Sequence, residues 1–224
     1  MSQDAKRPFD PENAMVLLRR AVDGLPAPSM FELRARGYGS LFQQVVACMI
    51  SVRTYEEVSL PASIRLFERA PSAAEVAHLE VAEIDSLISP STFHERKAVQ
   101  IREIARTTSL QFEGELPCDE ATVLAFPGIG PKCAALALGI ACGQERLPVD
   151  IHVHRIANRW GVVTTKSPEQ TQIALQEVFP PKYWLEVNER LVPFGKAICT
   201  RLRPKCSTCL LFDMCQQVGV TNPR

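Results

Sequence analysis

Four of the chain's eight cysteines lie within 17 residues, and their spacing is typical of a metal site. Cys199, Cys206, Cys209 and Cys215 are separated by six, two and five residues. Zinc sites usually contain two close pairs of ligands, whereas this segment has one pair between two single cysteines at unequal distances. The spacing therefore favours a four-iron four-sulfur (4Fe-4S) cluster, with zinc as the alternative.

The segment between the first two of these cysteines is strongly basic. Arg201, Arg203 and Lys205 place three positive charges within six residues. A cluster held by four thiolates carries net negative charge, so these side chains could balance it. They could also pair with the phosphates of a nucleic acid, with an affinity that falls steeply as salt rises. The two roles are compatible, and we expect the phosphate contacts.

A glycine-containing turn lies upstream, between two segments with helical periodicity. Residues 126–132 read Phe-Pro-Gly-Ile-Gly-Pro-Lys, and Pro131 suits the first position of a helix. At Gly128, Ile129 and Gly130 the backbone N–H groups can point outward at a helix N-terminus and grip a phosphate without reading base sequence. A plain turn without a ligand is the alternative.

Charge is distributed unevenly along the chain. The net charge is zero, which by itself does not suggest a polyanionic partner. Residues 132–205, however, contain 11 basic and six acidic side chains and carry +5, which leaves −5 on the rest. Such asymmetry is typical of a protein with one face that meets a polyanion, and a random partition of charge is the alternative.

The composition also bounds the location of the chain. No apolar stretch is long enough to span a bilayer and the N-terminal sequence is polar, so we expect no signal peptide and no membrane partner. We expect a cytoplasmic, nucleoid-associated protein in a bacterium, or a nuclear or mitochondrial one in a eukaryote. Such a location also argues against a disulfide framework for the clustered cysteines. The other four lie singly in apolar surroundings and are expected in the core: Cys48, Cys118, Cys133 and Cys142.

Helices must position these residues, because helical periodicity dominates the chain. Apolar residues recur at helical spacing in residues 41–51, 62–67, 98–106, 121–126, 132–141 and 153–160. No run of alternating residues bounded by hairpin turns is present. The sequence therefore predicts an all-α fold.

Three motifs, taken in order, resemble the endonuclease III family of helix-hairpin-helix DNA glycosylases. They are the hairpin at 126–132, the segment Val149-Asp150-Ile151-His152-Val153-His154-Arg155-Ile156-Ala157-Asn158-Arg159 and the four-cysteine loop, and the resemblance runs from about Ser40 to Cys215. It implies a six-helix domain, residues 34–144, that contains the hairpin. It also implies a 4Fe-4S cluster domain, residues 1–33 and 145–224, with a DNA-binding cleft between the two.

The resemblance also implies an active site made of Lys132 and Asp150, which lie 18 residues apart. Loss of a base leaves positive charge at the anomeric carbon of deoxyribose, which a carboxylate can stabilise while a lysine amine attacks that carbon and forms a Schiff base. The imine then permits β-elimination of the 3′ phosphate. The alternatives are a solvated lysine and an aspartate that only caps the following helix, although Asp150 could cap and catalyse together.

Three further residues are implied to fill the space left by a flipped base. They are Arg53, Phe93 and His152, which otherwise would be a surface arginine, a core phenylalanine and a helix-start histidine. The chain departs from the family pattern at Arg53, where glutamine is found in the bacterial prototype, at Thr92, where glycine is usual, and at Ile151, where threonine is usual. These departures concern lesion preference and strand contacts, and leave the Lys132–Asp150 pair unchanged.

The expected function is therefore that of a bifunctional DNA glycosylase and apurinic/apyrimidinic lyase of base excision repair. Its partner would be double-stranded DNA containing damaged bases, chiefly oxidised pyrimidines, or abasic sites, and we expect a monomer. One alternative is an adenine-mismatch glycosylase of the same superfamily, which Lys132 argues against. The other is a helix-hairpin-helix module that binds DNA without catalysis.

Overall fold

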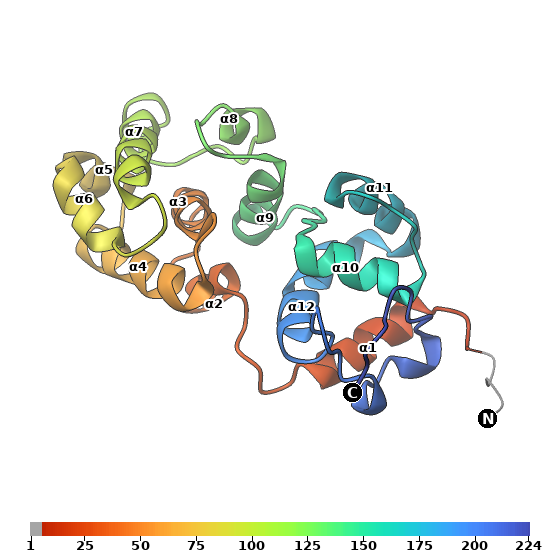
Figure 1. Ribbon diagram of the computed structural model, residues 1–224. Coiled ribbons are helices and arrows are strands. Elements are labelled where there is room, and N and C mark those ends of the chain that lie inside the picture. Colours follow the sequence, from red (N-terminus) through yellow and green to blue (C-terminus); the bar gives the residue numbers. More distant parts are fainter. Residues whose placement is uncertain (1–5) are drawn as a thin grey trace. The chain divides into compact units, whose positions relative to one another are not determined.

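The computed structural model describes residues 6–224, and every regular element in that range is a helix (Figure 1). The prediction of an all-α fold is confirmed. The chain divides into two compact units, of which one is Pro28–Gln144. The other combines the N-terminal stretch up to Ala27 with Glu145–Arg224. None of the helices in the described range has both the length and the apolar character needed to cross a membrane.

The unit Pro28–Gln144 is built around one buried helix. Its helices are α2 (Ser29–Ala35), α3 (Leu41–Ser51), α4 (Glu56–Arg69), α5 (Ala73–His78), α6 (Val81–Ile88), α7 (His94–Gln111), α8 (Glu120–Leu124) and α9 (Pro131–Cys142). A capping box between Ser40 and Gln43 starts α3. Helix α3 is predominantly apolar, is buried along almost its whole length and packs against α2, α4, α7 and α9.

Helices α8 and α9 form the hairpin that the sequence predicts. The Asp119 carboxylate caps α8 by accepting from the Thr122 N–H at 2.7 Å. Pro131 is the first residue of α9, and Gly143 ends that helix in the left-handed conformation. Since α9 is apolar on all sides, it packs against α3 and fixes the hairpin to the buried centre of the unit.

The expectation that four single cysteines belong to the core is wrong for two of them. Cys48 and Cys133 are buried as predicted. Cys118 and Cys142 form a disulfide instead, between the exposed loop before α8 and the last residue of α9. Neither cysteine is covered by its apolar neighbours in the sequence, because one lies in a loop and the other at the end of a helix. The hairpin brings these two positions together.

The second unit is built around one amphipathic helix, α10 (Ile151–Trp160). Its elements are α1 (Pro11–Ala21), α10, α11 (Pro168–Val178), η1 (Pro181–Tyr183), α12 (Trp184–Ala197), η2 (Cys206–Thr208) and η3 (Phe212–Met214). The apolar face of α10 buries Val153, Ile156, Ala157 and Trp160. It packs against α11 and α12, and α12 also packs against α1. The N-terminal helix and the cysteine loop therefore share one hydrophobic core.

Removal of the disulfide should destabilise the protein. Cys118→Ser opens a link between residues 24 positions apart, for which chain entropy predicts a loss of about 3 kcal/mol in the free energy of unfolding. Urea unfolding under non-oxidising and oxidising conditions measures this difference. Equal urea midpoints for the oxidised wild type and Cys118→Ser would contradict the disulfide.

Candidate active site and cluster-binding loop

The hairpin leaves the N-terminus of α9 open to solvent. Gly130 is the N-cap residue of α9, and no side chain caps the helix there. A Cβ atom at Gly130 would meet no atom within 4 Å, so the space beside it is free. Because N–H groups in a first helical turn lack intrahelical acceptors, an anion can approach them at this position.

Gly128 sets the shape of the hairpin. Its φ of +90° lies in the left-handed region, and an added Cβ would stand 2.9 Å from the Nε2 atom of Gln100. The Gln100 amide donates to the Pro127 carbonyl at 3.0 Å and so ties the turn to α7. The side chain of Ile129 is buried, with 8% exposed, so only the backbone of this residue is available to a ligand.

Lys132 is the second residue of α9, and its side chain is exposed. It therefore belongs to the same helical turn as the open N–H groups of the hairpin. A phosphate bound at those groups would bring its nucleotide close to the lysine amine. The structure thus places an exposed lysine in the first turn of the helix that follows the hairpin.

Asp150 is the N-cap residue of α10, as one of the alternatives in the sequence predicts. Its Oδ1 atom accepts from the N–H groups of His152 at 2.8 Å and of Val153 at 2.9 Å. These two bonds hold the half-buried carboxylate in one orientation at the helix N-terminus. Capping and catalysis are compatible at Asp150, because both capping hydrogen bonds are accepted by one carboxylate oxygen, Oδ1.

His152 lies in the first turn of α10, where α12 approaches it closely. The Arg155 guanidinium is 3.2 Å from His152 Nδ1 and also donates to the Gly195 carbonyl at 3.0 Å. A Cβ atom at residue 195 would stand 2.5 Å from His152 Nδ1. Only a glycine leaves room for the imidazole at this crossing.

Two arginines from α10 hold the start of the cysteine loop. Arg155 donates to the Cys199 carbonyl at 3.0 Å, and burial lowers the pKa of its guanidinium. Arg159 donates to the carbonyls of Thr200 at 2.7 Å and Arg201 at 2.6 Å. Sequence reasoning did not assign these roles, although the spacing of four residues places both arginines on one side of the helix.

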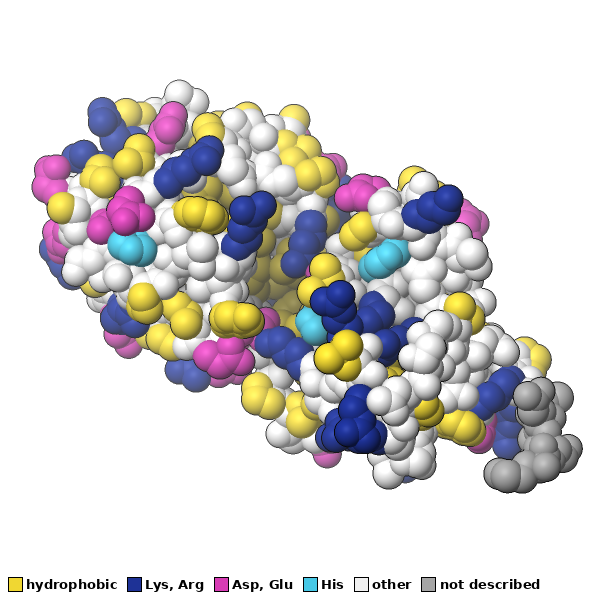
Figure 2. Space-filling model, viewed as in Figure 1, with side chains coloured by type: hydrophobic (Ala, Val, Ile, Leu, Met, Phe, Trp, Pro, Cys, Tyr) yellow, Lys and Arg dark blue, Asp and Glu magenta, His cyan; other side chains and the backbone are white. Residues whose placement is uncertain are grey.

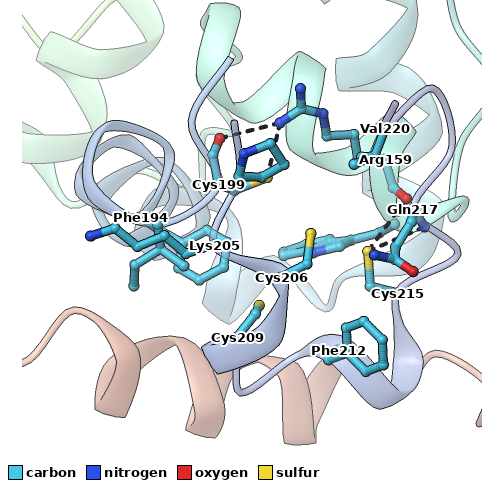
Figure 3. Close-up of a pocket in the computed structure, with 13 residues that line it drawn as sticks. Arg159, Phe194, Cys199, Lys205, Cys206, Cys209, Phe212, Cys215, Gln217 and Val220 are labelled. Carbon is cyan, nitrogen blue, oxygen red and sulfur yellow. Dashed lines mark hydrogen bonds between the residues drawn. The ribbon is translucent and has the colours of Figure 1, made fainter. Parts of the chain in front are cut away.

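The four clustered cysteines line one cavity of about 370 Å³, a volume that includes its opening to solvent. Figure 3 shows their side chains around a common space, with Arg159 extended toward Cys199. Trp160 and Phe194 contribute to the apolar wall. Among the described residues, however, no three Cys, His, Asp or Glu side chains lie closely enough to hold a single metal ion.

The donor chemistry around the sulfur atoms fits an anionic metal–thiolate group. Arg159 Nη1 lies 3.4 Å from Cys199 Sγ, and the Gln217 N–H lies 3.4 Å from Cys215 Sγ. Burial raises the pKa of the Cys209 thiol to about 11 and also raises that of Cys215. Thiolates in this partly buried cavity would be stabilised by a bound metal group.

The basic residues of the loop are exposed, as a phosphate-binding role requires. Arg201, Arg203 and Lys205 all present their side chains to solvent. Figure 2 shows Lys and Arg side chains gathered on the viewed face of this unit, over the region where Figure 1 labels α10 and α12. The loop is held by backbone bonds from Lys205 to Ile198 and from the C-terminal Arg224 to Pro204.

Arg53 and Phe93 both lie in the unit Pro28–Gln144 and share an unusual backbone conformation. Their φ angles are +55° and +60°, in the region that non-glycine residues rarely adopt. Arg53 is exposed, and the Phe93 side chain is 55% exposed, so the alternative of a core phenylalanine is wrong. The two loops are joined where the Thr92 N–H donates to Thr54 Oγ1 at 3.1 Å.

Comparison with known proteins agrees with the motifs and the geometry. Residues 46–181 match the HhH-GPD superfamily of base excision DNA repair proteins. Endonuclease III of Thermotoga maritima is 35% identical over 175 residues, which cover 78% of this chain and 82% of that protein. The chain belongs to the endonuclease III family.

Other members of the endonuclease III family are longer. The chain is 36% identical to bovine (Bos taurus) endonuclease III-like protein 1 over 197 residues, which cover 87% of this chain and 65% of the bovine protein. It spans 50% of endonuclease III homolog 2 of Arabidopsis thaliana. A non-covalent endonuclease III–DNA complex shares the fold, with a TM-score of 0.77, 22% identity and coverage of 93% and 96% of the two chains.

The stability that the start of α7, directly after Phe93, contributes to the fold should depend on pH. The hydrogen bond to Asp85, 2.6 Å from Nδ1, raises the pKa of His94. A histidine whose pKa is raised in the folded state stabilises the fold fully below its ordinary pKa of about 6.5. This contribution is lost as pH rises through the raised pKa. Asp85→Asn should therefore lower the melting temperature more at pH 5.5 than at pH 9, and a pH-independent difference would contradict the pairing.

Proposed function

We propose that this endonuclease III family member is a bifunctional DNA glycosylase and apurinic/apyrimidinic lyase that removes oxidised pyrimidines from duplex DNA. The observation that carries the proposal is the exposed Lys132 in the first turn of α9, directly after the open hairpin. A lysine in this position offers an amine nucleophile beside a site for the DNA backbone.

The proposed reaction begins at the anomeric carbon of the damaged nucleotide. The Lys132 amine forms a bond to C1′ while the base leaves with the electron pair of the glycosidic bond. Opening of the sugar gives an imine between Lys132 and C1′. Loss of a proton from C2′ then drives departure of the 3′ phosphate, and water releases the unsaturated aldehyde from the lysine. Each step needs only acid–base chemistry at the amine and the sugar.

Asp150 would stabilise the positive charge that develops on the sugar and accept or return protons during imine formation. Its N-cap bonds support this role, because they fix the carboxylate before substrate binds. Lys132 and Asp150 belong to different units of the chain. The proposal therefore requires both units to act on one deoxyribose.

We infer that Cys199, Cys206, Cys209 and Cys215 hold a 4Fe-4S cluster. When bound, the cluster would supply four covalent cross-links rather than a reactive atom for base excision. The N–H donors beside Cys199 and Cys215 support an anionic group in this cavity. By fixing the loop, these ligands would present Arg201, Arg203 and Lys205 to the DNA backbone.

Base flipping would use side chains from both units. Arg53 and Phe93 would enter the duplex from exposed, strained loops, while His152 would act from the first turn of α10. An adenine-mismatch glycosylase remains the alternative within the superfamily, but it has no need for a nucleophilic lysine at position 132. A non-catalytic module has no need for a lysine and an aspartate at this spacing, Lys132 and Asp150.

Borohydride trapping tests the proposed nucleophile. With duplexes that contain thymine glycol or an abasic site, the wild type should form a reduced covalent adduct that Lys132→Gln abolishes. Lys132→Arg is the matched control, because it keeps the charge but forms no Schiff base. Asp150→Asn retains a good N-cap and should slow turnover by about 10²- to 10⁴-fold.

No adduct with either duplex would contradict the lyase proposal. An adduct that persists in Lys132→Gln would assign the nucleophile to another residue. Unchanged turnover in Asp150→Asn would reduce that residue to a helix cap.

Metal analysis tests the proposed cluster. The purified chain should be brown and contain iron and sulfide in equal amounts, and Cys209→Ala should lose both together with affinity for duplex DNA. Cys142→Ser is the matched control and should keep the iron, because Cys142 lies outside the cavity. A colourless protein that contains zinc without sulfide would contradict the assignment.

A further inference from the structure

Lys97 is a buried cation whose partners are all neutral. It is 5% exposed on α7, and its Nζ atom donates to the carbonyls of Ile50 at 2.7 Å and Val52 at 2.9 Å. A third bond goes to Thr54 Oγ1 at 3.2 Å. The ammonium group has three donors, so these bonds satisfy all of them.

The three acceptors lie at the end of α3 and in the loop after it, which contains Arg53. Ile50 and Val52 lie at the C-terminal end of α3, where carbonyls lack intrahelical donors and attract a positive charge. Thr54 Oγ1 also accepts from the Thr92 N–H, one residue before Phe93. The Lys97 ammonium therefore fixes two carbonyls that precede Arg53 and the hydroxyl that follows it, which also joins this loop to the next.

Lys97 holds the Phe93 loop through its own backbone. Its N–H donates to the Phe93 carbonyl at 3.0 Å, which is the first hydrogen bond of α7. One residue thus contacts the loops of both positive-φ residues, through the side chain on one side and the backbone on the other. Left-handed conformations of non-glycine residues persist only where their surroundings determine them.

A buried lysine is a costly way to hold two loops together. Burial lowers the pKa of Lys97 to about 8, because desolvation disfavours the charged ammonium group. An apolar side chain of similar length would avoid this cost, whereas it would leave the carbonyls at the end of α3 without donors. The arrangement is consistent with a side chain retained for geometry rather than for stability.

We propose that Lys97 is a positioning residue that fixes Arg53 and Phe93 as one rigid pair before DNA binds. This inference rests on the proposed function, since it assumes that the pair fills the space left by a flipped nucleotide. Arg53 and Phe93 would make the contacts with DNA, and Lys97 would act only through them. Preorganisation of this kind lowers the cost of inserting both side chains into the duplex.

The test uses the full-length protein and a duplex with 2-aminopurine opposite a tetrahydrofuran abasic analogue. Insertion of side chains unstacks 2-aminopurine and raises its fluorescence. Lys97→Met should weaken the fluorescence response and the affinity for this duplex by about tenfold, because it removes buried hydrogen bonds that fix the inserted pair. Affinity for an undamaged duplex should stay within about twofold, since phosphate contacts dominate it.

Two further variants keep the test decisive. Thr54→Val is nearly isosteric and removes only the hydroxyl between Lys97 and Thr92, so it decides the question if Lys97→Met fails to fold. Thr107→Val on the same helix is the matched control, because it lines a separate surface pocket. It should behave as wild type.

Three outcomes separate the possibilities. A reduced response in Lys97→Met or Thr54→Val, with normal binding of undamaged DNA, supports the proposal. An unchanged response in folded variants overturns it, and so does a parallel loss of affinity for damaged and undamaged duplex, which indicates a general structural role. Borohydride trapping of the wild type on an abasic duplex is measured separately, so failure of the lyase proposal would be visible as an absence of adduct whatever the fluorescence response.

Discussion

The two arginines on one side of α10 make the interaction on which the C-terminal part of the structure depends. Arg155 and Arg159 donate to backbone carbonyls at the start of the cysteine loop, and Arg159 also reaches Cys199 Sγ. The same helix begins at Asp150 and ends at Trp160 in the core. One rigid element therefore orients the carboxylate at its N-terminus and the loop that would hold the cluster along its length.

A comparable constraint organises the unit Pro28–Gln144. Helix α3 is buried along almost its whole length and supports the hairpin through α9 and the exposed loops through α4 and α7. A buried cation at Lys97 completes this support where α3 ends. In both units, positive side chains within the fold bind backbone carbonyls.

Local features of the site were predictable from the sequence, while the contacts between distant segments were not. The periodicity at 41–51 predicts α3 with the bounds that the structure shows, because apolar residues recur there at helical spacing. Lys97 carries no such signal, since a lysine in a helix is usually solvated. Cys118 was misassigned to the core, because its disulfide partner lies 24 residues away and only the tertiary fold brings the two together.

Peptide mapping of the borohydride-reduced complex tests the central claim most directly. The enzyme would be trapped on an abasic duplex, digested with nuclease and protease, and analysed by mass spectrometry for the residual sugar. The modification should lie on Lys132 alone. A modification on another lysine or on the N-terminal amine, with Lys132 unmodified, would contradict the assignment of the nucleophile and with it the proposed reaction.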